Sequence, residues 1–238
     1  MTDAARWAIS TGLSFVAGSI PFGLLIARAR GVDIRLHGSR NIGATNVWRV
    51  LGKGPGLLCF ALDVLKGAAP VALAGLWLGV LGAPAMPPRD AALWMAVAAA
   101  AMLGHMFTPF AGFRGGKGVA TGLGACAALW PAVSVAAAAA LLAWLVSARA
   151  TRYVGLSSCI AAGVLPVAVA LAHAAGLAGD APDAASRAAQ GWPFIAMTAA
   201  LGALVIWKHR GNLARTIAGT EHRIGERGAP ARPESESR

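Results

Sequence analysis

The sequence predicts an all-α integral membrane protein with seven transmembrane helices, its N-terminus outside and its C-terminus in the cytoplasm. Three observations predict this class. Of the 238 residues, 57% are apolar and only 13% are charged, which is unusual for soluble domains. The apolar residues form runs of about 20, the length that a helix needs to cross a bilayer. Lys and Arg stand mainly in the short segments between these runs, as the positive-inside rule expects.

The apolar segments lie at about residues 7–28, 55–79, 91–110, 118–146, 153–174 and 190–207. The first segment could be mistaken for a signal peptide, because it is apolar from Trp7 to Ala27. A signal peptide carries its positive residues before the apolar region, whereas Arg28, Arg30 and Arg35 follow it here. We therefore expect this segment to remain in the mature protein as a helix.

The fourth apolar segment decides the number of crossings. It is long for one helix and contains Pro131 near its middle, where proline removes a backbone donor and favours the start of a new helix. With a break at Pro131, the outer connections hold only Arg6, Arg89 and Arg187. Without the break, the cations from Lys208 onward would lie outside, against the positive-inside rule. The sequence therefore predicts seven crossings, with the two short halves in a thinned or protein-lined region.

These helices are expected to form one membrane domain over residues 1–227. Three basic, Gly-rich segments should lie on its inner side, at residues 38–53, 104–122 and 208–225. Residues 228–238 are rich in Pro, Glu, Ser and Arg and have no large apolar side chain to bury. We expect this tail to be disordered.

Several other classes of protein do not fit this composition. The net charge is +11, but no basic face carries the interleaved aromatics typical of nucleic-acid binding. Cys59, Cys126 and Cys159 lie in apolar runs without CxxC or Cys/His spacing, so neither a disulfide framework nor a zinc site is indicated. We expect no nucleic acid, no metal and no cofactor.

The first inner segment is dense in hydrogen-bond donors. Its glycines let backbone N–H groups turn toward an anion, and Arg49 can donate two hydrogen bonds to one oxyanion. A solvated Gly-rich turn with helix caps would have a similar composition. If the segment binds phosphate, the neutral donors that it offers are Gly38, Ser39, Asn41, Thr45 and Asn46.

The second inner segment begins at Gly104-His105 and contains the sharper pattern Gly115-Gly116-Lys117-Gly118. A glycine turn that opens into a helix brings free N–H groups, the positive helix end and a lysine ammonium to one point, which suits a phosphate. It is not a Walker A loop, because Ala111 replaces the first glycine of that motif and Gly118 replaces its Ser or Thr. A tight turn at the membrane edge is the alternative.

The third inner segment leaves the last apolar run as Trp207-Lys208-His209-Arg210-Gly211-Asn212. Cations just inside a membrane helix often serve only as a topology anchor. If the helix continues, however, His209, Asn212 and Arg215 lie near one face because they are spaced by three. This spacing favours a shared binding region.

Two charged residues lie within an apolar run. Asp63 and Lys66 are three residues apart in the second run. A charge costs about 2.5–3.5 kcal/mol at the centre of an inserted helix. We therefore expect the two side chains to be paired, to face protein and to be structural.

From Gly18-Ser19-Ile20-Pro21 to Gly225, the three segments together resemble the bacterial acyl-phosphate:glycerol-3-phosphate acyltransferase family. The resemblance implies a seven-helix inner-membrane enzyme of phospholipid synthesis. Such an enzyme moves a fatty acyl group from acyl phosphate to the sn-1 hydroxyl of glycerol 3-phosphate, giving lysophosphatidate and phosphate. It also suggests two partners, membrane lipid and the enzyme that makes acyl phosphate, and leaves the oligomeric state open.

Residue roles follow from the resemblance by motif position. Ser39 and Arg49 would be essential, and His209 and Asn212 would support activity. Glu221 would be structural. After Tyr153-Val154 the family often has a serine that faces the phosphate site, whereas this chain has Gly155, leaving Ser157 or Ser158 as substitutes. The expected substrate ligands are Gly38, Asn41, Thr45, Asn46, His105, Gly115, Gly116, Lys117, Gly118, Ser158 and Arg215.

The base for acyl transfer is not obvious from the sequence, which has neither a His-x4-Asp dyad nor a Gly-x-Ser-x-Gly elbow. Acyl phosphate is already activated, so proximity and charge neutralisation can supply much of the rate. A substrate phosphate is the expected base, as the resemblance also suggests, and His209 is the second choice.

One other functional class stays open. A transporter of small organic phosphates would also want basic clusters, but it would place its binding groups near the midplane of the bilayer. A phosphotransferase acting on a nucleotide-activated lipid would need clustered metal-binding aspartates. Only Asp63 lies within an apolar segment, which argues against this class.

Overall fold

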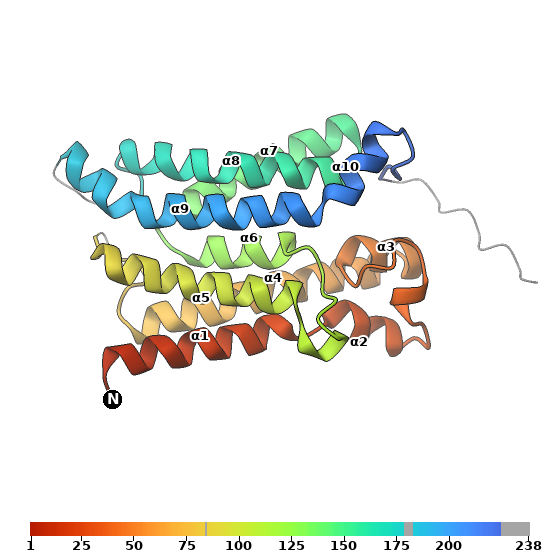
Figure 1. Ribbon diagram of the computed structural model, residues 1–238, viewed down its shortest axis with the longest axis horizontal. Coiled ribbons are helices and arrows are strands. Elements are labelled where there is room, and N and C mark those ends of the chain that lie inside the picture. Colours follow the sequence, from red (N-terminus) through yellow and green to blue (C-terminus); the bar gives the residue numbers. More distant parts are fainter. Residues whose placement is uncertain (84, 179–182, 225–238) are drawn as a thin grey trace, which may run out of the picture.

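The computed structural model describes residues 1–83, 85–178 and 183–224, and this part of the chain is all-helical. The expected tail at 228–238 and Gly225 lie outside the described residues. The elements are α1 (Asp3–Ser19), α2 (Phe22–Arg28), η1 (Ile34–Leu36), α3 (Ala44–Leu51), α4 (Lys53–Trp77), α5 (Pro88–Met106), η2 (Pro109–Ala111), α6 (Val119–Ala128), α7 (Ser134–Thr151), α8 (Val154–Ala174), α9 (Ala184–Lys208) and α10 (Arg210–Ile217). Of the connections in this part of the chain, the one from α2 to α3 holds the 3-10 turn η1 and the one from α5 to α6 holds the 3-10 turn η2. Figure 1 shows how the helices are arranged.

Among the described residues, six helical stretches are long and apolar enough to cross a membrane. The break expected near Pro131 is present, because α6 ends at Ala128 and α7 begins at Ser134. The two halves are unequal, however, with 10 residues in α6 and 18 in α7. At 1.5 Å per residue, α6 spans only about 15 Å of a hydrocarbon core about 30 Å thick. A seventh crossing through α6 therefore stays a prediction.

Two boundaries differ from the sequence prediction. The first apolar segment forms two helices, because Pro21 cannot continue the hydrogen-bond ladder of α1. At this break the carbonyl oxygen of Ile20 accepts hydrogen bonds from the N–H of Phe22 at 3.1 Å and from Lys66 Nζ at 2.7 Å. Helix α9 starts six residues earlier than expected, because Asp183 caps it through a 2.8 Å bond from the N–H of Ser186. Arg187 consequently lies in the first turn of α9 and not in a connection.

The helices form two groups, which Figure 1 shows one above the other. In the first group α1 packs against α5, α4 packs against α6, and α2 and α3 contact α4. In the second group α8 packs between α7 and α9, and α10 contacts α8 and α9. The groups meet where α5 contacts α9 and where α6 contacts α7. A functional site built from both groups must therefore lie across this boundary.

Small residues allow the backbones of α4 and α6 to touch. A Cβ added to Gly67 would clash with the carbonyl of Thr121, and one added to Gly124 would clash with the carbonyl of Val64. Small residues at helix contacts permit this close approach in membranes, where lipid is as apolar as the side chains. The short α6 is thus held against protein along one side.

We expect Gly124→Ala to lower the thermal unfolding midpoint of the purified protein in detergent. The added methyl overpacks the α4–α6 contact, which typically costs about 1–3 kcal/mol. Gly163→Ala is the matched control, because this exposed glycine of α8 has no neighbour within 4 Å of an added Cβ. Equal midpoints for the two variants would show that the contact is not tight.

Candidate active site

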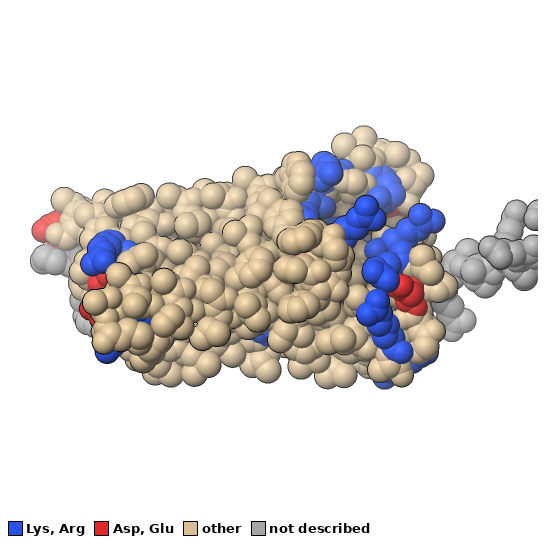
Figure 2. Space-filling model, turned by 60° about the horizontal axis from the view of Figure 1, so that its bottom comes forward, with Lys and Arg blue, Asp and Glu red and all other residues tan. Residues whose placement is uncertain are grey.

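Cations gather at one end of the molecule, shown on the right in Figure 2, and fewer lie at the other end. The cationic end holds α2, α3 and α10 (Figure 1). All three inner segments predicted from the sequence reach this end, and each is built differently.

Asn46 organises the first segment. Its side chain is 2% exposed, and its Oδ1 accepts a hydrogen bond from the N–H of Ser39 at 2.8 Å. Its amide nitrogen donates to the carbonyl oxygens of His37 and Asn41 at 3.0 and 2.9 Å. Asn46, which we predicted as a substrate ligand, therefore closes the loop on itself and presents Ser39 at the exposed surface.

The remaining polar residues of this segment shape the start of α3. Gly38 has φ +58°, and a Cβ there would clash with Asn46 Oδ1, so this turn requires glycine. Asn41 Oδ1 accepts a 2.9 Å hydrogen bond from the N–H of Gly43, the residue that caps α3. Thr45 and Arg49 lie one turn apart on α3, so their side chains lie on one face of this helix.

The second segment folds back over the end of α5. The N–H of Gly115 donates to the carbonyl oxygen of Met106 at 3.2 Å, and the N–H of Gly116 donates to that of His105 at 3.1 Å. Gly118 then takes φ +82° and caps α6, which glycine does without strain. Lys117 is thereby held next to the positive end of α6.

His105 lies beneath this loop. It is 5% exposed, and a Cβ on Gly116 would run into its ring. Its Nδ1 faces Asp63 Oδ1 at 3.7 Å, and the same carboxylate oxygen lies 2.7 Å from Lys66 Nζ. The structure thus places His105, which we predicted as a substrate ligand, in a buried cluster that supports the loop.

The third segment does not continue α9 as one helix. Helix α9 ends at Lys208, His209 caps it, and α10 starts at Arg210. Asn212 and Arg215 nevertheless converge, because both bind the carboxylate of Glu221. Asn212 Nδ2 donates to Oε1 at 2.6 Å, and Arg215 Nε donates to Oε2 at 2.7 Å.

Lys117 joins the second and third segments. Its Nζ donates a hydrogen bond to Asn212 Oδ1. A chain of contacts therefore runs from Lys117 through Asn212 and Glu221 to Arg215, and it crosses the boundary between the two helix groups. The sequence prediction that these distant segments come together agrees with this geometry.

Ser158 is occupied within the helix packing. It is 2% exposed, and its hydroxyl donates to the carbonyl oxygen of Val154 at 2.8 Å and accepts from Trp144 Nε1 at 3.2 Å. Gly155 is where Asn212 packs on α8, because an added Cβ would lie 2.6 Å from Asn212 Cβ. A serine at position 155 would therefore require Asn212 to move.

Burial and neighbouring cations shift the titration of the site. The pKa of Lys117 is lowered to about 8, first by burial and also by the positive charges of Arg215 and Arg49, against the opposing charge of Glu221. Burial likewise lowers the pKa of Arg49 below its ordinary value. The charges of Lys117, Arg49 and Arg215 therefore act on one another, and the negative charge of the Glu221 carboxylate opposes them. This excess of positive charge favours the binding of a further anion.

His209 is held neutral at neutral pH. Burial and the nearby charge of Lys117 lower its pKa to about 4. Its Nδ1 lies 2.8 Å from the carbonyl oxygen of Val205. A carbonyl oxygen only accepts, so Nδ1 carries the proton and Nε2 keeps a free lone pair. The imidazole can therefore accept a proton.

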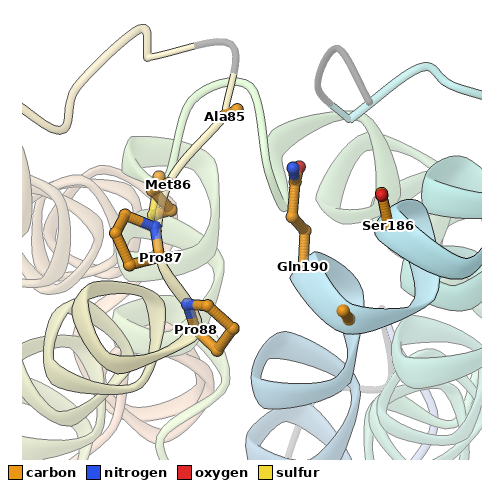
Figure 3. A pocket seen from close by; sticks show the side chains of 7 residues that line it. Ala85, Met86, Pro87, Pro88, Ser186 and Gln190 are labelled. Atoms are coloured by element: carbon orange, nitrogen blue, oxygen red, sulfur yellow. The ribbon is translucent and has the colours of Figure 1, made fainter. Parts of the chain in front are cut away.

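A pocket at the opposite end of the bundle is lined by none of the candidate site residues. Figure 3 shows it between the first turns of α5 and α9, with a volume of about 410 Å³. None of the described residues that line it is charged. The lining residues are Ala85, Met86, Pro87, Pro88, Ser186, Ala189 and Gln190. In the described part of the chain, no group of three or more His, Cys, Asp and Glu side chains is placed to hold a metal ion.

Comparison with known proteins identifies the family. The family model described as glycerol-3-phosphate acyltransferase matches residues 8–219. This chain belongs to the glycerol-3-phosphate acyltransferase family. It is 40% identical to the glycerol-3-phosphate acyltransferase of Thermosynechococcus vestitus over 94% of this chain and 98% of that protein. It is 43% identical to the glycerol-3-phosphate acyltransferase of Geobacter sulfurreducens, over 91% of this chain and 96% of that protein.

Solved structures of a glycerol-3-phosphate acyltransferase have the same fold. The glycerol 3-phosphate form of PlsY (YgiH), an integral membrane enzyme, superposes with a TM-score of 0.75 at 36% identity, covering 92% of this chain and 96% of that one. The lysophosphatidic acid form of the same enzyme superposes with a TM-score of 0.73 at 35% identity, covering 92% of this chain and 95% of that one. The chain is therefore a multi-pass membrane acyltransferase of phospholipid synthesis, which confirms the predicted enzyme class and sets the transporter alternative aside.

Some contacts of this candidate site were not predicted from the sequence. Lys208 Nζ donates to the carbonyl oxygen of Met106 at 3.0 Å and lies over the ring of Phe107, so α9 is tied to the end of α5. Arg152 binds the backbone of Ile224. These pairs are 102 and 72 residues apart, and only the presence of a cation at a helix end pointed to them.

The affinity for a phosphate monoester should fall as pH rises through about 8, because Lys117 loses its charge there. Only the ammonium form attracts the phosphate, so we expect affinity about tenfold lower at pH 9 than at pH 7. Lys117→Arg should remove most of this decline, since a guanidinium stays charged. Calorimetric titration with glycerol 3-phosphate measures it, and an unchanged affinity at pH 9 in the wild type would exclude Lys117 as the titrating ligand.

Proposed function

We propose that the protein transfers a fatty acyl group from acyl phosphate to the sn-1 hydroxyl of glycerol 3-phosphate. The products are lysophosphatidate and inorganic phosphate, and the step comes early in phospholipid synthesis. One observation carries the proposal: Lys117, Asn212, Glu221 and Arg215 are connected across the two helix groups, with Arg49 close enough for its charge to act on Lys117. The bound forms of the solved relatives, glycerol 3-phosphate and lysophosphatidic acid, support it.

Anion binding follows from the charges at the site. Lys117 and Arg49 hold the phosphate of glycerol 3-phosphate, with Arg215 adding charge from α10. Ser39 and Thr45 are exposed on the neighbouring loop and helix, and their hydroxyls donate to the same anions. The N–H groups of Gly115 and Gly116 are already bound by the carbonyl oxygens of Met106 and His105, so the partial positive charge comes from the start of α6. Together these groups offset the repulsion between two anionic substrates.

The reaction itself needs little covalent help from the protein. The sn-1 hydroxyl oxygen attacks the acyl carbon, a C–O ester bond forms, and the bond from that carbon to the phosphate oxygen breaks. Phosphate is a good leaving group, so the site contributes mainly by bringing the two reactants together. The hydroxyl proton passes to a substrate phosphate. His209 is the second candidate base, because it is neutral and Nε2 is free.

We place this site on the cytoplasmic side of a bacterial inner membrane, with seven crossings, the N-terminus outside and the C-terminus inside. The clustering of Lys and Arg at the end with α3 and α10 supports this orientation (Figure 2). The short α6 is the crossing that the proposal adds to the six long stretches. Its packing against α4 supplies protein in place of lipid along one side.

Arg49→Ala should lower turnover at least a hundredfold, because charge stabilisation of a reacting anion is typically worth this much. Purified protein is given acyl phosphate and labelled glycerol 3-phosphate, and lysophosphatidate is measured. Arg30→Ala, which removes an exposed arginine from the same connection, is the control and should be unaffected.

Thioesters of coenzyme A and of acyl carrier protein test the donor in the same assay. We expect product from acyl phosphate alone. Near-normal turnover of Arg49→Ala would remove Arg49 from the mechanism, and product from a thioester but none from acyl phosphate would refute the proposed donor.

His209→Gln separates the two candidate bases. Glutamine keeps a polar amide at this position but cannot act as a base. General base catalysis is typically worth about 10²–10⁴-fold, so a substrate base predicts a loss of turnover below about tenfold. A loss above a hundredfold, with unchanged affinity for glycerol 3-phosphate, would instead assign the proton to the imidazole.

A further inference from the structure

The chain after α10 returns to the site. The N–H groups of Thr220 and Glu221 both donate to the carbonyl oxygen of Arg215, at 2.8 and 3.2 Å. This turn brings Glu221 back beside α10, where its side chain is almost completely buried. No helix or strand stabilises residues 218–224, so the position of Glu221 depends on what holds this segment.

Arg152 holds the far end of that segment. Its Nε and Nη2 donate to the carbonyl oxygen of Ile224 at 3.1 and 2.6 Å. Its own carbonyl oxygen accepts from the N–H of Ile224 at 2.8 Å. Both backbone polar groups of Ile224 are therefore bound by one residue, located at the two-residue connection between α7 and α8.

The next residue strengthens the anchor. Tyr153 accepts a 3.1 Å hydrogen bond from Arg223 Nε through its hydroxyl, and the Arg223 guanidinium lies 5.3 Å from the centre of the Tyr153 ring. Two consecutive residues of the α7–α8 connection thus bind two consecutive residues of the C-terminal segment. Glu221 lies between this anchor and the turn at Arg215.

The backbone at Arg152 indicates that its side chain is needed. Arg152 caps α7 with φ +62°, a conformation in which glycine or asparagine is favoured and other residues are strained. Arginine has no advantage for the turn itself. The hydrogen bonds from its guanidinium to Ile224 give it a role that glycine could not fill.

We propose that Arg152 is a positioning residue of the site. By anchoring Ile224 it holds Glu221 against Asn212 and Arg215. Glu221 accepts from the amide nitrogen of Asn212 and so turns Asn212 Oδ1 toward Lys117. Releasing the anchor frees all three side chains from this arrangement. The inference rests on the proposed function of the site as the phosphate-binding centre.

Arg152→Gly tests the proposal, because it removes the guanidinium and relieves the backbone. We expect the KM for glycerol 3-phosphate to rise about tenfold while kcat changes less than threefold. Arg152→Lys keeps the charge but loses the forked donor, and it should behave like Arg152→Gly. Arg149→Ala, an exposed arginine one turn earlier on α7, is the matched control and should have the wild-type KM.

The order of action is tested with Glu221→Gln. If Arg152 works through Glu221, the double variant should have a KM no higher than the worse single variant. The proposal would be overturned if the two substitutions multiplied their effects on the KM in the double variant, or if Arg152→Gly had the wild-type KM. A lower thermal midpoint with an unchanged KM would mean a purely structural role and would also overturn it.

Two readouts independent of turnover separate this inference from the proposed function. Hydrogen exchange of the amides at 218–224 should speed up in Arg152→Gly but not in Arg149→Ala. The affinity for inorganic phosphate, measured by calorimetry, should fall about tenfold. If the wild type forms no lysophosphatidate, the proposed function fails, and these two measurements still decide whether Arg152 positions the anion site; unchanged exchange and affinity would refute it.

Discussion

The hydrogen bond from Lys117 to Asn212 is the contact on which the site depends. It joins the loop before α6 to α10, and thus the first helix group to the second. Arg49 comes with the first group, whereas His209 and Glu221 come with the second. Without this contact the cations would line two separate surfaces, and neither would surround an anion. The proposed anion site therefore depends on how the two groups pack.

The Gly115–Gly118 turn, which carries Lys117, is in turn supported by a buried cluster of side chains. At the break before Pro21, the carbonyl oxygen of Ile20 accepts from the N–H of Phe22 and also from Lys66 Nζ, which pairs with Asp63. His105 Nδ1 faces the same carboxylate, and Gly116 packs directly against the His105 ring. A buried charge is costly in lipid unless it is paired. This cluster is therefore stable only while α4, α5 and the start of α2 stay packed against one another.

Much of the architecture could be predicted, because the lengths of the apolar runs and the positions of the cations between them follow directly from the order of residues in the sequence. The break at Pro131 followed from both. The break at Pro21 was missed because the residues on either side of it stay apolar. Side-chain direction could not be predicted: the motif pattern gives residue type and spacing, but Asn46 faces its own loop. For Arg152 the sequence offered only a cation at a helix end, because its partner is 72 residues away.

Labelling of single cysteines from each side of the membrane tests the central claim most directly. Lys117 and Asn212 are replaced by cysteine one at a time, in a chain whose native Cys59, Cys126 and Cys159 have been removed. The account predicts that a membrane-impermeant maleimide modifies both positions in inside-out vesicles and neither in intact cells. Modification of the two positions from opposite sides, or of either one from outside the cell, would contradict it.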